Sequence, residues 1–316
     1  MREMAPTRPF ELEKVELKLG RLARLKRNFA ERVVELFLFL AATSSVLVTF
    51  GIITILVVES IPFFSQVSIW DFVTGTVWTP LFANPQFGIL PLLMGTFLTT
   101  VIALLLAIPV GTLIAILMNE YLPARISEIL KPLLELLAGV PTVVYGYFAL
   151  LFVTPLLQKI IPGLGGFNVL SAGLVIGIMI VPYISSLSED AMRSVPKDLR
   201  EASYALGATR AQTSLKVIVP AAFSGLTSAY ILGISRAFGE TMVVAIAAGM
   251  QPNLTLNPTE PAATITAFIV QVSLGDLPHG SIGYQSIYVA GLSLLVLTMI
   301  FNLLGFALRR KFREAY

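Results

Sequence analysis

The sequence predicts an all-α membrane protein with six transmembrane helices and with both chain ends in the cytoplasm. Only 13% of the 316 residues are charged and 56% are hydrophobic, whereas a soluble domain carries about 25% charged residues. Six apolar segments are each long enough to cross about 30 Å of hydrocarbon as a helix. Basic residues collect in alternate connecting segments, which is the pattern that orients membrane proteins.

The expected spans are residues 33–58, 89–118, 132–157, 169–187, 221–248 and 282–308. With the N-terminus inside, twenty of the twenty-two lysines and arginines are cytoplasmic, and the exceptions are Lys159 and Arg236. Since basic residues avoid translocated loops, both ends are expected inside. The resulting domains are a basic cytoplasmic segment (1–32), a first transmembrane helix (33–58), a periplasmic loop (59–87), a transmembrane domain (88–308) containing a cytoplasmic loop (188–220), and a cytoplasmic tail (309–316).

The first 32 residues are too long and too mixed in charge for a cleavable signal peptide. Leu12, Val15, Leu19 and Leu22 recur at helical spacing with basic residues between them. This pattern indicates a helix on the inner membrane surface. The alternative is a solvated tail.

The two long outer loops are rich in apolar residues. Residues 59–87 contain both tryptophans, Trp70 and Trp78, and such aromatics are typical of the membrane–water boundary; the alternative is a docking surface for an outside partner. The stretch "AATITAFIVQVSL" in 249–281 is too short to span, so it predicts a re-entrant or outer-surface helix.

His279, the single histidine, is interpreted as a loop residue. With no cysteine in the chain, a thiolate or His-rich metal site is not expected.

The largest cytoplasmic loop reads "SEDAMRSVPKDLREASYALGATRAQTSLKVIVP". Pro196 is typical of a first helical turn and Gly207 of a helix end. A second helix is expected from residue 209 to residue 218, ending at Pro220. The loop is therefore predicted to be two short exposed helices joined by a glycine turn.

Part of this loop, "EASYALGATRAQTSLKVIVP", resembles the EAA loop of ABC importer permeases. The matching positions are Glu201, Ala202, Ser203, Gly207, Val217, Val219 and Pro220. Ser203 stands where the family has a second alanine. The resemblance implies a type I importer fold and a loop that docks into a separate ATPase subunit; the alternative is an ordinary connector.

No ATP-binding loop is present, because no lysine follows a glycine anywhere in the chain and the phosphate-binding motif requires that pair. The chain is therefore expected to be a transport subunit without catalytic residues, not an enzyme. ATP and Mg would be bound by the partner ATPase, and no cofactor is expected in this chain.

Two charges, Arg236 and Glu240, stand in the apolar fifth span, in "GISRAFGETMVVA". On a continuous helix, residues four apart share a face. Charged residues in spans usually face a bundle interior or a water-filled cavity. Either the two charges form a buried ion pair, or they contact an anion in transit, with Glu240 orienting the guanidinium or accepting a proton from phosphate. Small residues on the same face (Gly225, Ala229 and Gly233) predict close helix packing or room for a ligand.

Three further stretches resemble the PstC branch of ABC permeases, the permease subunits of phosphate importers. They are "FGILPLLMGTFLTT" (87–100), "LELLAGVPTVVYGYFAL" (134–150) and "SRAFGETM" (235–242). The resemblance covers about 87–308 and implies phosphate import across a bacterial inner membrane, with Arg236 and Glu240 on the phosphate path. It also implies a PstA-like sister permease, two copies of a PstB-like ATPase and a periplasmic PstS-like phosphate-binding protein, and no nucleic-acid partner.

Three other functions remain open at this stage. A permease for another oxyanion or a phosphonate would import sulfate or a related anion in competition with phosphate. A proton-coupled secondary anion transporter would work without ATP. A non-transporting scaffold would keep its function after Arg236 is replaced.

Overall fold

The computed structural model describes residues 9–275, 277–278 and 280–311, and it describes side chains within these ranges except those of 9–30, 124 and 308–311. His279 and the end of the predicted tail (312–316) lie outside the described residues. The same holds for residues 1–8 and for the side chains on which the predicted amphipathic N-terminal helix depends.

The described chain divides into two units, Met1–Ile55 and Leu56–Tyr316. The first consists of most of helix α1 (Pro9–Phe64), which has one proline, Pro62, near its end. The part Glu31–Phe64 is long and apolar enough to cross a membrane. Its large side chains, such as Phe37 and Leu47, are exposed, as expected for a helix that contacts lipid. The first expected span is therefore confirmed as a helix.

The second unit contains three more helices that are long and apolar enough to span, Leu90–Tyr121, Val169–Arg193 and Ile282–Ala307. Two bent helix pairs raise the possible number of spans to six among the described residues. These ranges confirm the second, fourth and sixth expected spans. The corresponding elements are α3 (Leu90–Ile116) with the π-helical turn η1 (Leu117–Tyr121), α7 (Val169–Arg193) and α13 (Ile282–Lys311).

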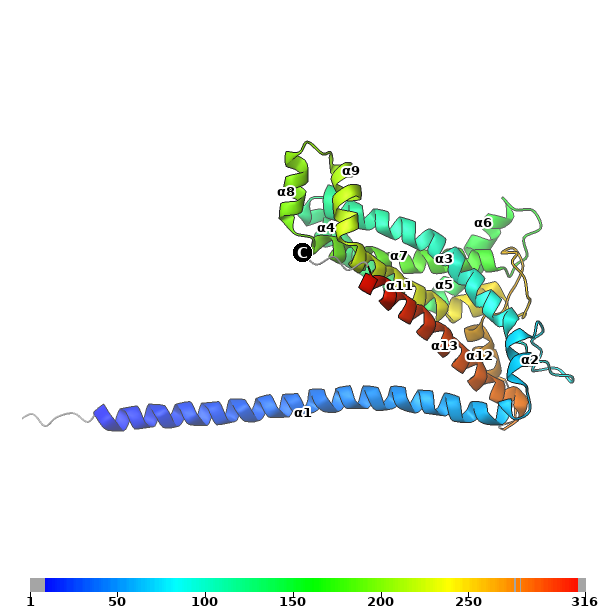
Figure 1. Cartoon of the computed structure of the whole chain (residues 1–316), viewed down its shortest axis with the longest axis horizontal. Helices are drawn as coiled ribbons and strands as arrows, with labels where there is room; N and C mark the ends of the chain where they lie inside the picture. The colour runs from blue at the N-terminus through cyan, green and yellow to red at the C-terminus, as the bar shows by residue number, and fades with distance from the viewer. Residues whose placement is uncertain (1–8, 276, 279, 312–316) are drawn as a thin grey trace, which may run out of the picture. The chain divides into compact units, whose positions relative to one another are not determined.

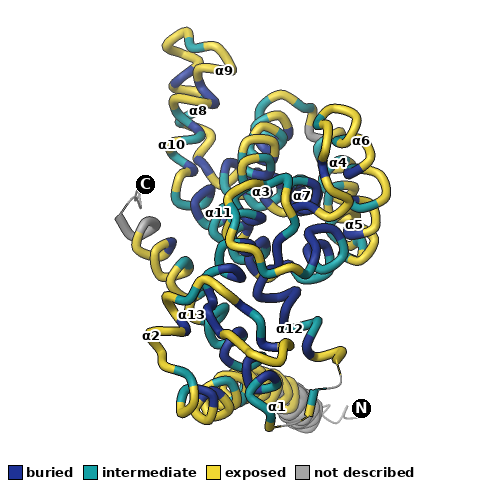
Figure 2. Tube along the Cα trace, turned by 90° about the vertical axis from the view of Figure 1, so that its right-hand side faces the viewer, coloured by how far each residue is buried: buried dark blue, intermediate teal, exposed yellow. Residues whose placement is uncertain are grey.

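The core of this unit is formed by α3 packed along α7, with α11 (Phe223–Phe238) between α7 and α13 (Figure 1). The helices approach closely because α7 carries glycines at the contact. A Cβ at Gly173 would lie 2.8 Å from the Ile102 side chain, and one at Gly177 would lie 2.8 Å from the Ala103 carbonyl oxygen. Small residues allow this backbone approach between membrane helices. Figure 2 shows α7 among the most buried parts of the chain.

The third expected span, residues 132–157, is wrong at its N-terminal end. Pro132 belongs to a separate helix, α4 (Ala124–Ala138), and the helical run Thr142–Gln158 is bent from it by 82°. Gly139 caps α4, and Pro141 disfavours helical geometry at the residue before it. The run consists of α5 (Thr142–Phe148), η2 (Ala149–Val153) and α6 (Thr154–Gln158).

The fifth expected span, residues 221–248, is not one helix. Helix α11 ends at Phe238, and a π-helical turn, η4, follows at Val244–Ala248. On its other side, α11 is bent by 75° from the helical run Arg210–Ala221. That run and the helix before it are α8 (Lys197–Ala205), α9 (Arg210–Thr213), η3 (Ser214–Ile218) and α10 (Val219–Ala221).

Several aromatic residues of the segment 59–87 form a packed cluster, which the sequence did not predict. Phe63, Phe72, Trp78 and Phe87 are buried, with edge-to-face ring contacts among them and from Trp78 to Phe268. Such pairs add stability beyond burial. The membrane-boundary and docking interpretations therefore apply only to the exposed rings, those of Trp70 and Phe82.

Two short helices complete this cluster. Helix α2 (Ile69–Thr74) supplies Phe72, and α12 (Ile265–Ser273) supplies Phe268. Helix α12 confirms the expected short helix in 249–281. Its buried residues pack against α13 and α3.

Gly95 of α3 is expected to tolerate no side chain, because a Cβ there would overlap the carbonyl oxygen of Ala263. Gly95→Ala should lower the free energy of unfolding by about 1–3 kcal/mol, the usual cost of overpacking. Thermal unfolding in detergent measures the change. The control is Gly51→Ala, since a Cβ at that helical glycine meets nothing within 4 Å. Equal effects of the two substitutions would contradict the prediction.

Candidate functional site

The predicted two-helix cytoplasmic loop is confirmed as a helical hairpin at one end of the bundle (Figure 1). Gly207 has φ +81°, a conformation that favours glycine. The second helix begins with a capping box between Thr209 and Gln212. Pro220 does not end this helix: it lies inside α10, which continues to Ala221, and the chain bends only at Ala222.

Glu201, Ala202 and Tyr204 of α8 are exposed, and so is Leu206, the residue that caps this helix. Leu206 is 89% exposed. A short helix with an apolar residue fully in solvent, held on a packed bundle, has the properties of an anchor that inserts into a groove of another protein. Glu201, Ala202 and Gly207 of the predicted coupling set therefore lie together on an accessible surface.

Ser203, also in that set, has a different environment, because its side chain faces the second helix. Its hydroxyl lies 2.9 Å from the hydroxyl of Thr213, and both residues are buried. A buried hydroxyl needs a partner. The serine found where the family has alanine is thus matched by a threonine across the hairpin, and the pair ties α8 to α9.

Arg200, which precedes the motif, was not identified from the sequence. Its Nε donates to Glu120 Oε1 at 3.2 Å, and its two terminal nitrogens donate to the carbonyl oxygens of Val195 and Met192. The acceptors belong to the ends of two membrane helices, η1 after α3 and the C-terminal end of α7. The sequence did show Glu120 as an acid at the end of an apolar span. It could not show that Arg200, eighty residues away, is its partner.

Arg236 lies in the last turn of α11. Gly239 caps the helix C-terminus, so Glu240 does not stand one turn further on the same helix, and the predicted shared face is wrong. A positive charge at a helix C-terminus is favourable, because it meets the negative end of the helix dipole. The position therefore lowers the cost of a cation within an apolar bundle.

Glu240 is buried, with 7% of its surface exposed, and it lies two residues before the next helical segment, which begins at Met242. Its Oε1 accepts hydrogen bonds from the backbone N–H groups of Met242 (3.1 Å) and Val243 (3.3 Å). Its own carbonyl oxygen accepts from Thr266 of α12 at 2.7 Å. This carboxylate caps a helix N-terminus, which explains why the chain breaks here: the acid stabilises a new helix and not the old one.

The guanidinium of Arg236 stacks on Tyr183 of α7, 4.5 Å from the ring centroid. Among the described side chains no carboxylate lies within ion-pair distance of it, and its Nε is buried without a hydrogen-bond acceptor. The ion pair with Glu240 that the sequence allowed is therefore absent from this conformation. The arginine keeps donor capacity that an anion could use.

The small-residue face of α11 packs against α7. A Cβ at Gly225 would lie 2.5 Å from Ala191, one at Gly233 would lie 3.1 Å from Ile184, and Ala229 is 1% exposed. Of the two expectations for this face, close packing is confirmed, and the residues leave no room for a ligand here.

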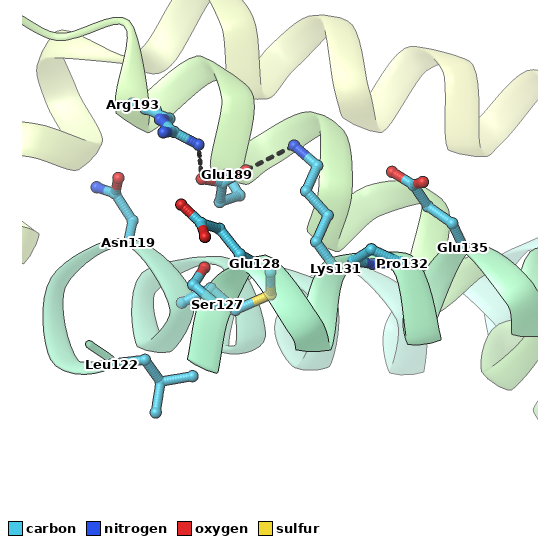
Figure 3. A pocket seen from close by; sticks show the side chains of 10 residues that line it. Asn119, Leu122, Ser127, Glu128, Lys131, Pro132, Glu135, Glu189 and Arg193 are labelled. Carbon is cyan, nitrogen blue, oxygen red and sulfur yellow. Dashed lines mark hydrogen bonds and ion pairs between the residues drawn. The ribbon is translucent and has the colours of Figure 1, made fainter. Parts of the chain in front are cut away.

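A second group of charges lies in a cavity of about 380 Å³ between α4 and α7 (Figure 3). Lys131 and Arg193 both point at the buried carboxylate of Glu189, with N–O distances of 2.7 and 3.9 Å, and Lys131 also pairs with Asp190. Both cations are already paired with carboxylates, so we interpret these ion pairs as a structural link between α4 and α7. In the described part of the chain, no group of histidine and acidic residues could hold a metal.

Comparison with known families gives one domain match. A family model described as "Binding-protein-dependent transport system inner membrane component" matches residues 107–314. Among solved structures, a chain of a bacterial alginate ABC transporter aligns with a TM-score of 0.61 at 18% identity, over 89% of this chain and 96% of that one. The MetNI methionine ABC transporter aligns with a TM-score of 0.53 at 19% identity, over 72% and 95%. These likenesses confirm the expected importer permease fold.

Several curated proteins are also similar in sequence. "Probable ABC transporter permease protein YqgH" of Bacillus subtilis is 41% identical over 234 residues, 74% of this chain and 75% of the relative. "Phosphate transport system permease protein PstC" of Mesorhizobium japonicum is 33% identical over 254 residues, 73% and 75% of the two chains. A probable PstC of Methanocaldococcus jannaschii is 32% identical, with 73% and 78% covered.

The hydroxyl pair in the hairpin gives a test that needs no partner protein. Ser203→Ala leaves the buried Thr213 hydroxyl without its partner and should cost about 1–3 kcal/mol. Hydrogen exchange of the hairpin amides measures the local loss. The double variant Ser203→Ala/Thr213→Val removes both hydroxyls and should recover most of the protection; a double variant less protected than the single one would contradict the pairing.

Proposed function

The chain belongs to the family of binding-protein-dependent transport system inner membrane components, and on this premise we propose that it is the subunit that conducts inorganic phosphate in an ATP-driven importer. Members of the family are permease components, so the chain is a transport subunit of an ABC importer and not an enzyme. The observation that carries the choice of cargo is Arg236, a half-buried guanidinium that stacks on Tyr183 and has no carboxylate within ion-pair distance among the described side chains.

Phosphate suits this site chemically. The planar guanidinium donates two parallel hydrogen bonds to a tetrahedral oxyanion, and the stacking on Tyr183 leaves its edge for that purpose. At neutral pH phosphate still carries a proton, and this O–H can donate a hydrogen bond to Glu240 Oε2; among the described residues only Oε1 of Glu240 takes part in the capping bonds. Fully deprotonated sulfate has no proton to give. The names of the relatives in several organisms support the same cargo.

The hairpin is the proposed coupling element. The exposed face of α8 would dock into a cytoplasmic ATPase, which binds ATP and Mg, while this chain binds no cofactor. The assembly would contain a PstA-like sister permease, two PstB-like ATPase copies and a periplasmic PstS-like binding protein. In the proposed orientation both termini and the hairpin are on the cytoplasmic side of the inner membrane, as the distribution of basic residues indicates.

Arg236→Lys tests the cargo site. The substitution keeps the charge but removes the planar fork, so phosphate uptake by the assembled complex in vesicles should fall at least about tenfold, equivalent to about 1.4 kcal/mol. The matched control is Arg193→Lys, because that guanidinium side chain is 70% exposed and has only a 3.9 Å contact with Glu189. Near-normal uptake by Arg236→Lys, or equal inhibition by sulfate and phosphate in the wild type, would overturn the proposal.

Gly207 tests the coupling element. Gly207→Val forces a β-branched residue to positive φ, at a cost of about 1–2 kcal/mol, and the distorted turn should lower ATPase-dependent uptake several-fold. Asparagine tolerates this conformation better, so Gly207→Asn should retain most activity. A Cβ at this position meets nothing within 4 Å, which excludes steric overlap as the cause. Full uptake by Gly207→Val would contradict a rigid-turn requirement.

A further inference from the structure

Helix α8 is attached to the membrane helices through one side chain that makes polar contacts with both of them. Arg200 reaches Glu120 of η1 with Nε and the ends of the α7 region with its terminal nitrogens, at 3.2 Å to Val195 O and 2.8 Å to Met192 O. All three nitrogens of the guanidinium are therefore used. Met192 lies in the last turn of α7, where its carbonyl oxygen also accepts from the Val195 N–H, and Val195 follows the helix.

This contact is protected from water. The side chain of Arg200 is 16% exposed and that of Glu120 is 4% exposed. Salt and solvent weaken exposed ion pairs, but a buried pair with its hydrogen bonds made is costly to break from one side. Asn119 donates a further hydrogen bond to Glu120 Oε1, which fixes the carboxylate. The junction is therefore rigid at the point where α8 begins.

An apolar contact supports the same junction. Leu199, next to Arg200, packs against a buried cluster made of residues from α3, α7, η3, α11 and the links after α7 and before α11: Ala115, Met192, Val195, Ile218, Ala222 and Leu226. On the other face of α8, about 200° around the helix from Leu199, Glu201 is exposed. One helix thus has an inner side fixed to the bundle and an outer side available to a partner.

Glu120, which accepts the hydrogen bond from Arg200, lies in η1, a π-helical turn. In this turn the Leu122 N–H donates to the carbonyl oxygen of Leu117 at 3.0 Å. Such turns occur mostly as single insertions in α-helices and often at functional positions. Here the turn carries Glu120 at the cytoplasmic-side end of α3, the helix that packs most extensively on α7.

We propose that Arg200, held by Glu120 and by the carbonyl groups of Met192 and Val195, is the positioning residue that transmits movement of the docked α8 helix to α3 and α7. The inference rests on the proposed function, because it assigns to the coupling element the side chain that links it to the helices of the pathway. Glu201 and its exposed neighbours would contact the ATPase, and Arg200 would transmit the resulting movement of α8 to α3 and α7. Loss of Arg200 should therefore separate ATP hydrolysis from transport without preventing docking.

The test uses the assembled complex in vesicles and measures phosphate imported per ATP hydrolysed. Arg200→Gln should lower this ratio about tenfold or more while ATP hydrolysis continues, because several buried charge-assisted hydrogen bonds are lost. Arg200→Lys keeps the charge but cannot reach three acceptors at once, and it should recover only part of the ratio. Glu120→Gln should lower the ratio less than Arg200→Gln, since the contacts with the two carbonyl groups remain.

The double variant Arg200→Gln/Glu120→Gln distinguishes one shared contact from two separate effects. Residues that act through one contact are not additive, so the double variant should be no worse than Arg200→Gln. The control is Lys197→Gln, on the same helix, where the lysine is exposed; its ratio should stay within about twofold of wild type. An unchanged ratio in Arg200→Gln, an additive double variant, or loss of the ATPase subunit from the complex would each overturn the inference.

A second measurement is independent of the cargo. The chain has no cysteine, so spin labels at Asp198→Cys on α8 and Leu113→Cys on α3, both exposed positions, report the distance between the helices in the assembled complex. The distance distribution should broaden when Arg200→Gln is added and stay narrow with Lys197→Gln. If the wild-type complex imports no phosphate but Arg200→Gln still broadens the distance distribution, the proposed cargo is contradicted and the role of Arg200 is supported. An unchanged distance distribution in Arg200→Gln would overturn that role.

Discussion

The fold depends on how charges are accommodated within an apolar helical bundle. Arg236 and Glu240 flank the point where α11 ends and a new helical segment begins, so each charge meets the favourable end of a helix dipole. A continuous helix would place both side chains against apolar neighbours at a cost of several kcal/mol. The helix break between these two charges leaves Arg236 stacked on Tyr183. It also leaves the carbonyl oxygen of Glu240 free to accept the hydrogen bond from Thr266 of α12.

The end of the bundle that carries the α8 hairpin follows the same rule with different partners. Arg200 is compensated by an acid and by carbonyl groups at the end of α7, and Glu189 is compensated by Lys131 from α4. Each buried charge there joins elements that are distant in the sequence. The bundle is consequently tied together at its charged positions, while the apolar faces of α3 and α7 supply the packing between them.

Much of this organisation could be predicted from the sequence, and the exceptions have physical causes. Apolar length was enough to locate α3, α7 and α13, and the position of Gly207 was enough to locate the hairpin turn. The end of α11 could not be predicted, because hydropathy continues across Gly239 and only the capping bonds of Glu240 favour a new helix. The Arg200–Glu120 contact and the buried aromatic cluster involve residues far apart in the chain, and one sequence without an alignment does not indicate such pairs.

The stacking of Arg236 on Tyr183 has a kinetic meaning for the proposed pathway. An arginine locked to a carboxylate would have to exchange one full negative charge for another before any anion could bind. An aromatic face holds the guanidinium in place with a weaker, neutral attraction of roughly 0.5–2 kcal/mol, and it stays in contact while the edge of the group is occupied. In the proposed pathway an anion can therefore bind Arg236 without first breaking an ion pair. Only a few hydrogen bonds then hold the anion, so it can leave quickly.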